Sequence, residues 1–149
     1  MIKELIHDPE FLSVKSVDAT LDDISVAEDL SDTITAHKDE CVGMAANMIG
    51  VQKNIIIYDN IIYDNGKDFQ VMFNPVIILK KMPYQTKEGC LSLLGLPRPC
   101  TRYKYIKVDY YELSYKSGNP VLVHKIGTFK DFTAQIIQHE IDHCNGILI

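Results

Sequence analysis

The chain has 149 residues, enough for one domain with a buried core, and 46% apolar against 23% charged residues is typical of a soluble globular protein. The net charge of −5 and the lack of any Lys/Arg run longer than two residues argue against nucleic-acid binding, which uses basic surfaces. No apolar stretch approaches the ~20 residues that span a bilayer, and no secretory or transit pattern is present. We therefore expect a single cytoplasmic domain over residues 1–149 with no membrane partner.

Cysteine chemistry follows from that expected compartment. The four cysteines are Cys41, Cys90, Cys100 and Cys144. Cytoplasmic thiols stay reduced, so disulfides are not expected and a thiolate is free to bind metal or take part in catalysis. Most of the four are expected to be plain buried thiols.

The first predicted element is a helix at about residues 21–38. Thr20 is placed to cap this helix, because Asp23 follows three residues later in the spacing of a capping box. Apolar residues then recur at helical intervals: Ile24, Ala27, Leu30 and Ile34.

Strands are predicted for the middle of the chain. Three segments are rich in β-branched and aromatic residues: 53–58, 69–73 and 76–79. Residues 64–66, Asp-Asn-Gly, predict a turn between the first two. Alternating apolar residues predict another strand over 103–113, and residues 117–120 predict a hairpin turn into 121–124.

The last predicted element is a helix near the C-terminus, with Thr128 as candidate N-cap and Asp131 three residues later. Two adjacent faces cover most of its circumference: Phe132, Ile136, His139 and His143 on one, and Ala134, Ile137, Ile141 and Cys144 on the next. Only a narrow polar strip remains: Gln135, Gln138 and Asp142. Such a helix is buried, so the histidines and the glutamate within it need partners.

Residues 139–143 of this helix form the motif His-Glu-x-x-His. His139 and His143 lie one turn apart on one face, so both imidazoles can reach the same metal ion. Glu140 lies to the side of that ion, where it can take a proton from a bound water. The motif predicts a metal-dependent hydrolase, and the alternative is two buried histidines satisfied by hydrogen bonds alone.

The third metal ligand must come from upstream in the chain. After His143 the only residue of ligand type is Cys144, which is turned by about 100° on the helix. Cys90 is the first candidate, because a thiolate is a strong soft donor and the preceding glycine permits close approach. Cys100 is the second candidate and Cys41 the third. Two imidazoles and one thiolate leave the fourth tetrahedral position open for water.

Three segments resemble, in order, the three motifs of the peptide deformylase family. They are residues 43–50 (Gly-Met-Ala-Ala-Asn-Met-Ile-Gly), 88–92 (Glu-Gly-Cys-Leu-Ser) and 138–143 (Gln-His-Glu-Ile-Asp-His). Asn74-Pro75, between the first two, also matches. The resemblance covers nearly the whole chain and is more specific than the helical metal motif alone.

This resemblance implies an α+β fold, in which antiparallel β-sheets pack around a central C-terminal helix carrying the metal motif, plus an N-terminal helix. It implies a metal-dependent hydrolase that removes the formyl group from the N-terminal formylmethionine of nascent polypeptides and releases formate. Fe²⁺ is the implied native ion, one per chain, and Zn²⁺, Ni²⁺ or Co²⁺ is able to substitute for it.

The family's residue roles carry over by position. Cys90, His139 and His143 would bind the metal, and Glu140 would be the general acid/base. The backbone N–H of Leu91 is expected to face the developing oxyanion. Five residues are expected to line the pocket that binds the methionine side chain: Val42, Gly43, Gly89, Phe132 and Ile136. Plain core packing is the alternative for four of them: Val42, Gly43, Phe132 and Ile136.

The sequence departs from the family's first motif at Met48, where glutamine is usual. A thioether has no hydrogen to donate to the formyl oxygen, and losing one oxyanion donor typically costs about 10²–10³ in rate. Gln52 is a conceivable replacement donor. The alternative function is therefore a deformylase-like paralogue with weak or different amidase or peptidase activity, or a non-catalytic metal- or peptide-binding homologue.

A second departure is the end of the chain at Ile149. Many bacterial family members carry a C-terminal helix or tail, and in some it docks on the ribosome. A contact near the ribosome exit would not use such a tail here. We expect a monomer whose partners are N-formylmethionyl nascent peptides.

Overall fold

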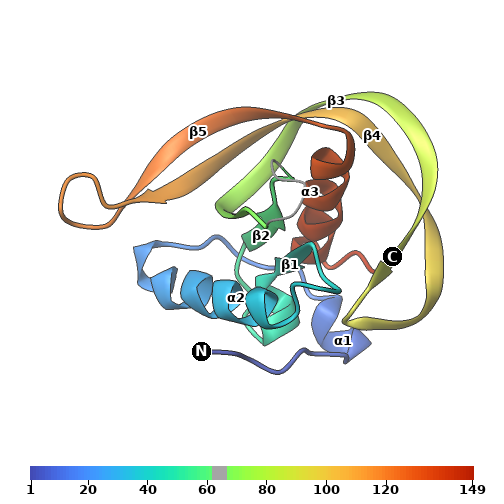
Figure 1. Cartoon of the computed structure of the whole chain (residues 1–149), viewed down its shortest axis with the longest axis horizontal. Coiled ribbons are helices and arrows are strands. Elements are labelled where there is room, and N and C mark those ends of the chain that lie inside the picture. Colours follow the sequence, from blue (N-terminus) through green and yellow to red (C-terminus); the bar gives the residue numbers. More distant parts are fainter. Residues whose placement is uncertain (62–66) are drawn as a thin grey trace.

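A bent antiparallel sheet wraps around the C-terminal helix α3 (Asp131–Cys144) in the computed structural model, which describes residues 1–61 and 67–149 (Figure 1). The five strands pair in chain order: β1 (Gly43–Ala45), β2 (Ile55–Asp59), β3 (Phe69–Cys90), β4 (Leu93–Ser114) and β5 (Val121–Lys130). β1 and β2 lie between α3 and the N-terminal helix α2 (Ile24–Ala36). The expected α+β fold class is confirmed. The predicted turn at 64–66 lies outside the described residues.

The N-terminal helix begins as the capping box predicts. The Thr20 amide donates to Asp23 Oδ2 at 2.9 Å, and Thr20 Oγ1 accepts from the Asp22 amide at 3.2 Å. The first turn is the 3₁₀ helix η1 (Leu21–Asp23), which leads into α2. Of the predicted apolar set, α2 buries Ala27, Leu30 and Ile34, whereas Ile24 is half-buried; Val26, which was not predicted, is buried as well. Before it lies a short helix, α1 (Pro9–Leu12), which the sequence did not predict.

The two strands predicted at 69–73 and 76–79 are one long strand, β3, with an irregularity between Phe73 and Val76. Asn74 has a positive φ of 54° at this irregularity, and its side chain accepts from the Ala19 amide at 2.7 Å and donates to the Ala19 carbonyl at 3.0 Å. These two hydrogen bonds stabilise the bend in β3 and connect this strand to the segment before α2. β3 then continues to Cys90, far beyond the predicted end, because β4 pairs with it along this whole length.

The start of the last helix was predicted wrongly. Thr128 is not an N-cap but lies inside β5, opposite Lys107, and the strand continues to Lys130 opposite Tyr105. The helix begins only at Asp131, whose φ of 53° turns the chain out of the sheet. Cross-strand hydrogen bonding of β5 with β4 outcompetes the local capping signal, which sequence spacing alone could not reveal.

The first motif of the sequence forms the short strand β1 and the 3₁₀ helix η2 (Ala46–Ile49), and all of these residues are buried. Together with α2, α3 and the inner side of the sheet they surround the hydrophobic core. Its largest fully buried side chains include Leu30, Ile34, Met48, Phe73 and Ile137. Within the described residues, no helix has the length and apolar character that crossing a membrane requires.

Candidate metal centre

Helix α3 presents two imidazoles and a carboxylate to the interior. His139, Glu140 and His143 are all buried, with 8%, 4% and 1% of their surface exposed. The two histidine rings lie 4.9 Å apart between centroids, and their Nε2 atoms are 3.2 Å apart. The spacing of four residues therefore brings both rings to one point, as the helical phase predicts.

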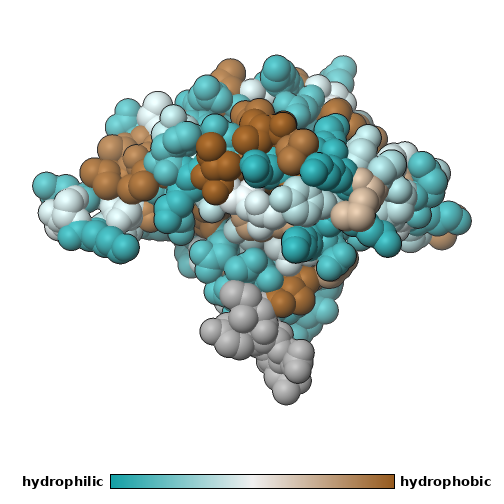
Figure 2. Space-filling view, turned by 90° about the horizontal axis from the view of Figure 1, so that it is seen from above, coloured by the Kyte–Doolittle hydropathy of each residue, from teal (hydrophilic) through white to brown (hydrophobic). Residues whose placement is uncertain are grey.

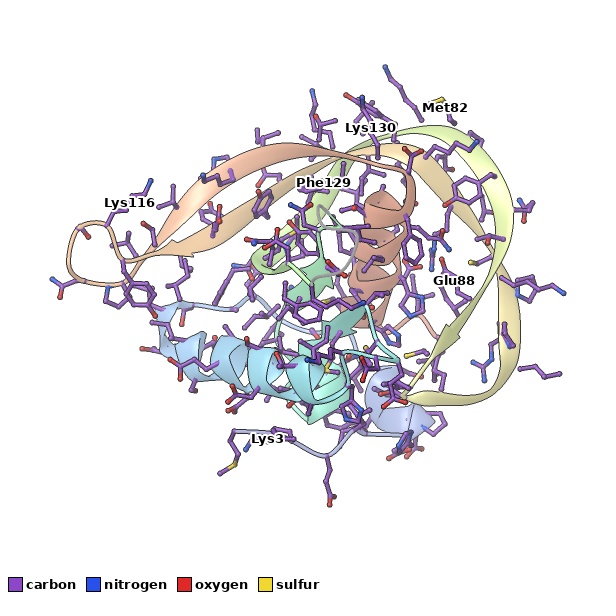
Figure 3. All side chains as sticks on the ribbon, in the orientation of Figure 1. Lys3, Met82, Glu88, Lys116, Phe129 and Lys130 are labelled. Carbon is purple, nitrogen blue, oxygen red and sulfur yellow. The ribbon has the colours of Figure 1, made fainter. Side chains whose placement is uncertain are left out.

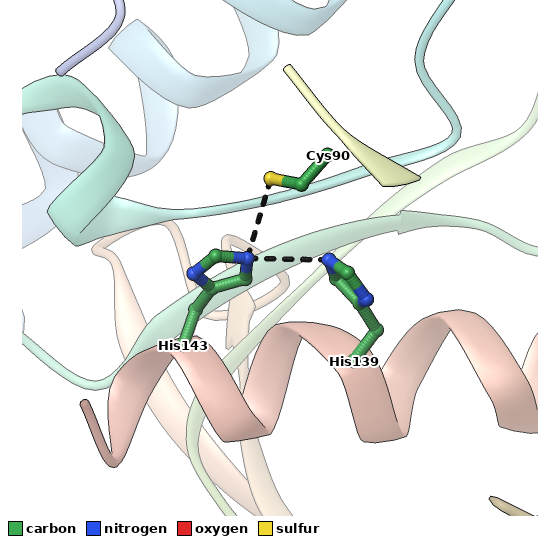
Figure 4. Close-up of side chains that lie close together, drawn as sticks. All are labelled: Cys90, His139 and His143. Carbon is green, nitrogen blue, oxygen red and sulfur yellow. Dashed lines mark hydrogen bonds between the residues drawn. The ribbon is translucent and has the colours of Figure 1, made fainter. Parts of the chain in front are cut away.

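Cys90, at the end of β3, completes the cluster. Its Sγ lies 3.3 Å from His143 Nε2, and the three donor atoms all lie within 4.8 Å of one another (Figure 4). Cys100 and Cys41, the second and third candidates, are outside this group, and the Cys41 thiol instead donates to the Gly43 carbonyl at 2.9 Å. A register shift between Glu88 and Cys90 turns the strand end toward α3.

The donor set fits a tetrahedral metal ion. With metal–nitrogen bonds of about 2.0–2.1 Å and a metal–sulfur bond of about 2.3 Å, tetrahedral ligand atoms lie roughly 3.3–3.6 Å apart. The observed contacts of 3.2 and 3.3 Å agree with this spacing. Three protein ligands of nitrogen and sulfur type leave one position open, which is the pattern of catalytic rather than structural sites.

A buried ion-pair network contacts His139 at Nδ1, on the side of the ring away from the metal cluster. Glu88 Oε1 accepts a hydrogen bond from His139 Nδ1 at 2.8 Å, so Nε2 is the ring nitrogen that faces the cluster. The Arg102 guanidinium donates to both oxygens of Glu88, at 2.7–3.1 Å, and to Asp142 Oδ2 at 2.7 Å. Gln135 Nε2 also donates to Glu88, at 2.9 Å. The polar strip predicted on α3 is therefore occupied by contacts with β3 and β4 rather than by solvent.

The electrostatics of the cluster favour a positive charge. Burial opposes ionisation of Glu88, but its hydrogen bonds with His139 and Arg102 hold the pKa of that carboxyl well below its usual range. Burial also opposes the charged form of His139, yet the neighbouring Cys90, Glu140 and Glu88 raise its pKa to about 10. Burial and the nearby His139 lower the pKa of His143 to about 3, which keeps this imidazole neutral and available as a ligand.

Glu140 is suited to proton transfer. Burial raises its pKa to about 7, and its Oε1 is buried without a hydrogen-bond partner among the described residues. A carboxyl group that titrates near the working pH is an efficient general acid/base. Gly43 packs directly against it: a Cβ at this position would lie 2.7 Å from Glu140 Oε2 and 2.6 Å from Ile136 Cγ2.

A pocket of about 400 Å³ opens beside the cluster. Its lining includes every predicted substrate-binding residue and the three proposed catalytic positions: Val42, Gly43, Met48, Gly89, Leu91, Phe132, Ile136 and Glu140. Phe132 is half exposed and Ile136 is buried, so plain core packing does not describe Phe132. Sequence analysis gave no site role to four other lining residues: Glu40, Lys87, Glu88 and Gln135. Glu88 and Gln135 directly adjoin the predicted residues Gly89 and Ile136, and that adjacency was the available signal. Cys41, the third candidate ligand, lines the pocket without joining the metal cluster.

Comparison with known proteins agrees with the motifs. A family model described as polypeptide deformylase matches residues 6–149. A peptide deformylase of Clostridium beijerinckii is 45% identical over 149 residues, which is 100% of both chains. The chain belongs to the peptide deformylase family. Peptide deformylase 1 of Clostridium perfringens is 34% identical over 145 residues, with 95% of this chain and 90% of the relative covered.

Solved peptide deformylase structures have the same fold. One from Legionella pneumophila is 30% identical and superposes with a TM-score of 0.78, covering 99% of this chain and 83% of that one. A class I type b peptide deformylase from Acinetobacter baumannii is 25% identical, with a TM-score of 0.80 and coverage of 99% and 96%. The family assignment is thereby confirmed, and the alternative of a functionally divergent homologue is not favoured.

This chain has a thioether, that of Met48, where the family motif has an amide. Met48 is 1% exposed and lines the pocket, and its Sδ lies 3.4 Å from the Ala45 amide nitrogen. Gln52, the conceivable replacement donor, directs its Nε2 to the Phe11 carbonyl at 3.4 Å and does not line the pocket. Neighbouring Asn47 has a structural contact instead, because its Nδ2 donates to the carbonyl of His143 at 2.8 Å.

Proposed function

We propose that this chain removes the formyl group from N-formylmethionyl nascent peptides, with Cys90, His139 and His143 holding one divalent ion and Glu140 as general acid/base. The observation that carries the proposal is the convergence of these three donors beside a buried carboxyl group, in a chain 45% identical to a peptide deformylase. We propose Fe²⁺ as the native ion, with Zn²⁺, Ni²⁺ or Co²⁺ as substitutes, because imidazole and thiolate donors accept all of these metals.

A divalent ion held by this donor set supplies Lewis-acid chemistry, which makes water nucleophilic near neutral pH. Glu140 takes the proton of the attacking water and delivers it to the amine that leaves as formate is released. Its pKa of about 7 lets it perform both transfers without a large energetic penalty in either direction.

The pocket positions the substrate for this reaction. The methionine side chain would occupy the apolar part, formed by Val42, Phe132 and Ile136. The Leu91 backbone, directly after the ligand Cys90, would offer its N–H to the oxygen of the tetrahedral intermediate. A preorganised backbone donor of this kind stabilises charge that develops only in the transition state.

The test is formate release from formyl-Met-Ala-Ser by protein reconstituted without oxygen with Fe²⁺, Ni²⁺, Co²⁺ or Zn²⁺, at measured metal occupancy. Glu140→Ala should keep its metal and lose about 10²–10⁴ in rate. Unformylated Met-Ala-Ser with an internal peptide bond serves as the matched control substrate. Fully loaded protein that releases no formate, or that hydrolyses the internal bond instead, would refute the proposal.

A further inference from the structure

The end of β3 presents different side chains to its outer and inner sides. Figure 2 looks from above onto the outer side of the curved sheet and shows mainly hydrophilic side chains around smaller hydrophobic areas. Successive residues of a strand face opposite sides, and Gln85 is exposed whereas Glu88 is buried. Tyr84 pairs in register with Arg102 on β4, whose guanidinium contacts Glu88. Because cross-strand partners share a side, Tyr84 and Glu88 both face α3 (Figure 3).

A row of hydrogen-bonded side chains leads from Tyr84 to the metal cluster. The Tyr84 hydroxyl lies 3.1 Å from Gln135 Oε1, and Gln135 Nε2 donates to Glu88 Oε2 at 2.9 Å. The other oxygen of Glu88 accepts from His139 Nδ1 at 2.8 Å. His139 Nε2, on the far side of the ring, lies 3.2 Å from His143 Nε2. Hydrogen bonds therefore connect a half-buried tyrosine on β3 with a proposed metal ligand on α3.

The donors and acceptors along this row have one consistent assignment. Glu88 is paired with Arg102 and is therefore a carboxylate, which has no hydrogen to donate. The Gln135 amide must direct its NH₂ group to Glu88 and its oxygen to Tyr84. Because an amide oxygen only accepts, the Tyr84 hydroxyl donates. The hydroxyl thus supports the amide orientation that Glu88 requires.

The helical spacing gives Gln135 influence over the orientation of Glu88. Gln135 and His139 lie four residues apart on α3 and are neighbours on one face. The Glu88 carboxylate bridges them, with Oε2 on Gln135 and Oε1 on His139. Arg102 also contacts both oxygens, but from β4. Gln135 is consequently the donor to Glu88 that shares a helix with the ligand, and its long side chain is fixed at the far end by Tyr84.

We propose that Tyr84 and Gln135 are positioning residues of the metal site: Tyr84 fixes the Gln135 amide, which sets the rotation of the Glu88 carboxylate and thereby the orientation of His139. The inference rests on the proposed role of His139 as a metal ligand. Hydrogen-bond partners of ligating histidines tune metal affinity without touching the metal. Tyr84 is not among the described residues that line the pocket, so its effect on the site passes through Gln135.

The experiment measures Co²⁺ affinity by competition with a chromophoric chelator, and the visible absorption of the Co²⁺-loaded protein, which reports ligand geometry. Tyr84→Phe removes only the hydroxyl, Gln135→Met keeps the side-chain length without the amide, and the double variant combines them. The matched control is Tyr105→Phe, which removes the hydroxyl of another half-buried tyrosine, on β4. kcat and KM for formyl-Met-Ala-Ser are measured at metal saturation, and circular dichroism checks folding.

Gln135→Met should bind Co²⁺ about tenfold more weakly, at the lower end of the range for partners of ligating histidines. Tyr84→Phe should lose about threefold, as expected for one neutral hydrogen bond. The double variant should match Gln135→Met, because the tyrosine acts only through the amide. Both single variants should shift the absorption bands, and Tyr84→Phe should lower kcat without changing KM. Tyr105→Phe should behave like the wild type throughout.

The proposal is overturned if both folded single variants bind Co²⁺ like the wild type, or if Tyr105→Phe weakens binding as much as Tyr84→Phe. It is also overturned if Tyr84→Phe causes the same loss with and without Gln135→Met, because additive losses indicate independent structural effects. A wild type that binds no Co²⁺ would overturn the proposed metal site and this inference with it. Normal affinities in all variants, with formate released, would remove the positioning role and leave the deformylase assignment intact.

Discussion

Glu88 Oε1 accepts a hydrogen bond from His139 Nδ1 at 2.8 Å, and this contact links the end of β3 to the metal helix. In Figure 3 the Glu88 side chain lies on the inner side of β3. The bond fixes the orientation of the imidazole, so that Nε2 faces His143 and Cys90. The ligand geometry thus depends on a carboxylate that itself touches no metal.

Replacement of this carboxylate should weaken metal binding. Glu88→Gln keeps the side-chain size but removes the negative charge that polarises His139, and loss of such a partner typically reduces metal affinity by about 10–100-fold. Competition with a chromophoric chelator measures the change, and circular dichroism checks that the variant is folded. Glu28→Gln, an exposed position on α2, is the control and should bind metal normally. Unchanged affinity in Glu88→Gln would show that the hydrogen bond does not support the ligand.

Arg102 should matter mainly for stability. Its guanidinium and Glu88 are almost fully buried, and removing one member of a buried pair leaves an uncompensated charge, which costs about 3–5 kcal/mol. Arg102→Met in metal-free protein should therefore lower the free energy of unfolding in urea by this amount. Arg98→Met removes an exposed contact with the terminal Ile149 carbonyl and should change it by less than about 1 kcal/mol.

The effect of Arg102→Met should also depend on pH. The pKa of Glu88 is held below its ordinary value of 4.5 in the folded protein, so its stabilising contribution is complete above that value and is lost as the pH falls. The difference between wild type and variant should shrink below about pH 4.5. A difference that grows in acid would contradict this assignment.

Gly43 should be required for the position of Glu140. Gly43→Ala would place a methyl group 2.7 Å from Glu140 Oε2 and 2.6 Å from Ile136, so one of them must move. A displacement of the base by about 1 Å typically costs on the order of 10² in rate, and we expect kcat to fall while metal content stays normal. In Gly89→Ala the added carbon has no neighbour within 4 Å, and the free energy of unfolding should not change. Full activity of Gly43→Ala would show that the carboxyl position is not critical.

Met48 should limit the rate, because no amide occupies the position where the family motif has one. Met48→Gln would restore a donor in the pocket, and kcat for formyl-Met-Ala-Ser should rise, by up to about 10²-fold. Met48→Leu removes the sulfur without adding a donor and should leave the rate near that of the wild type. No gain in Met48→Gln, with the protein folded and metal-loaded, would mean that the Leu91 N–H and the ion already suffice.

The chemistry of the site was predictable because its strongest signals are local. Four-residue spacing on a helix brings His139 and His143 to one point whatever the rest of the chain does. The capping box at Thr20 and the buried faces of α2 and α3 are local in the same sense. The choice of Cys90 over Cys41 and Cys100 was harder, since sequence ranked these thiols but could not measure which lay near the helix.

The remaining features depend on strand pairing, which joins residues far apart in the chain. Thr128 has the local pattern of a helix cap, but pairing with Lys107 keeps it in β5. Strand pairing also places Lys81, Tyr105 and Lys130 in one row, although the two lysines are 49 positions apart in the chain. Sequence by itself thus predicted His139, His143 and Glu140 as one cluster, through helical periodicity, and ranked Cys90 first among the thiols, through motif order. Only the tertiary structure decided which strands pair, and hence which residues far apart in the chain lie side by side.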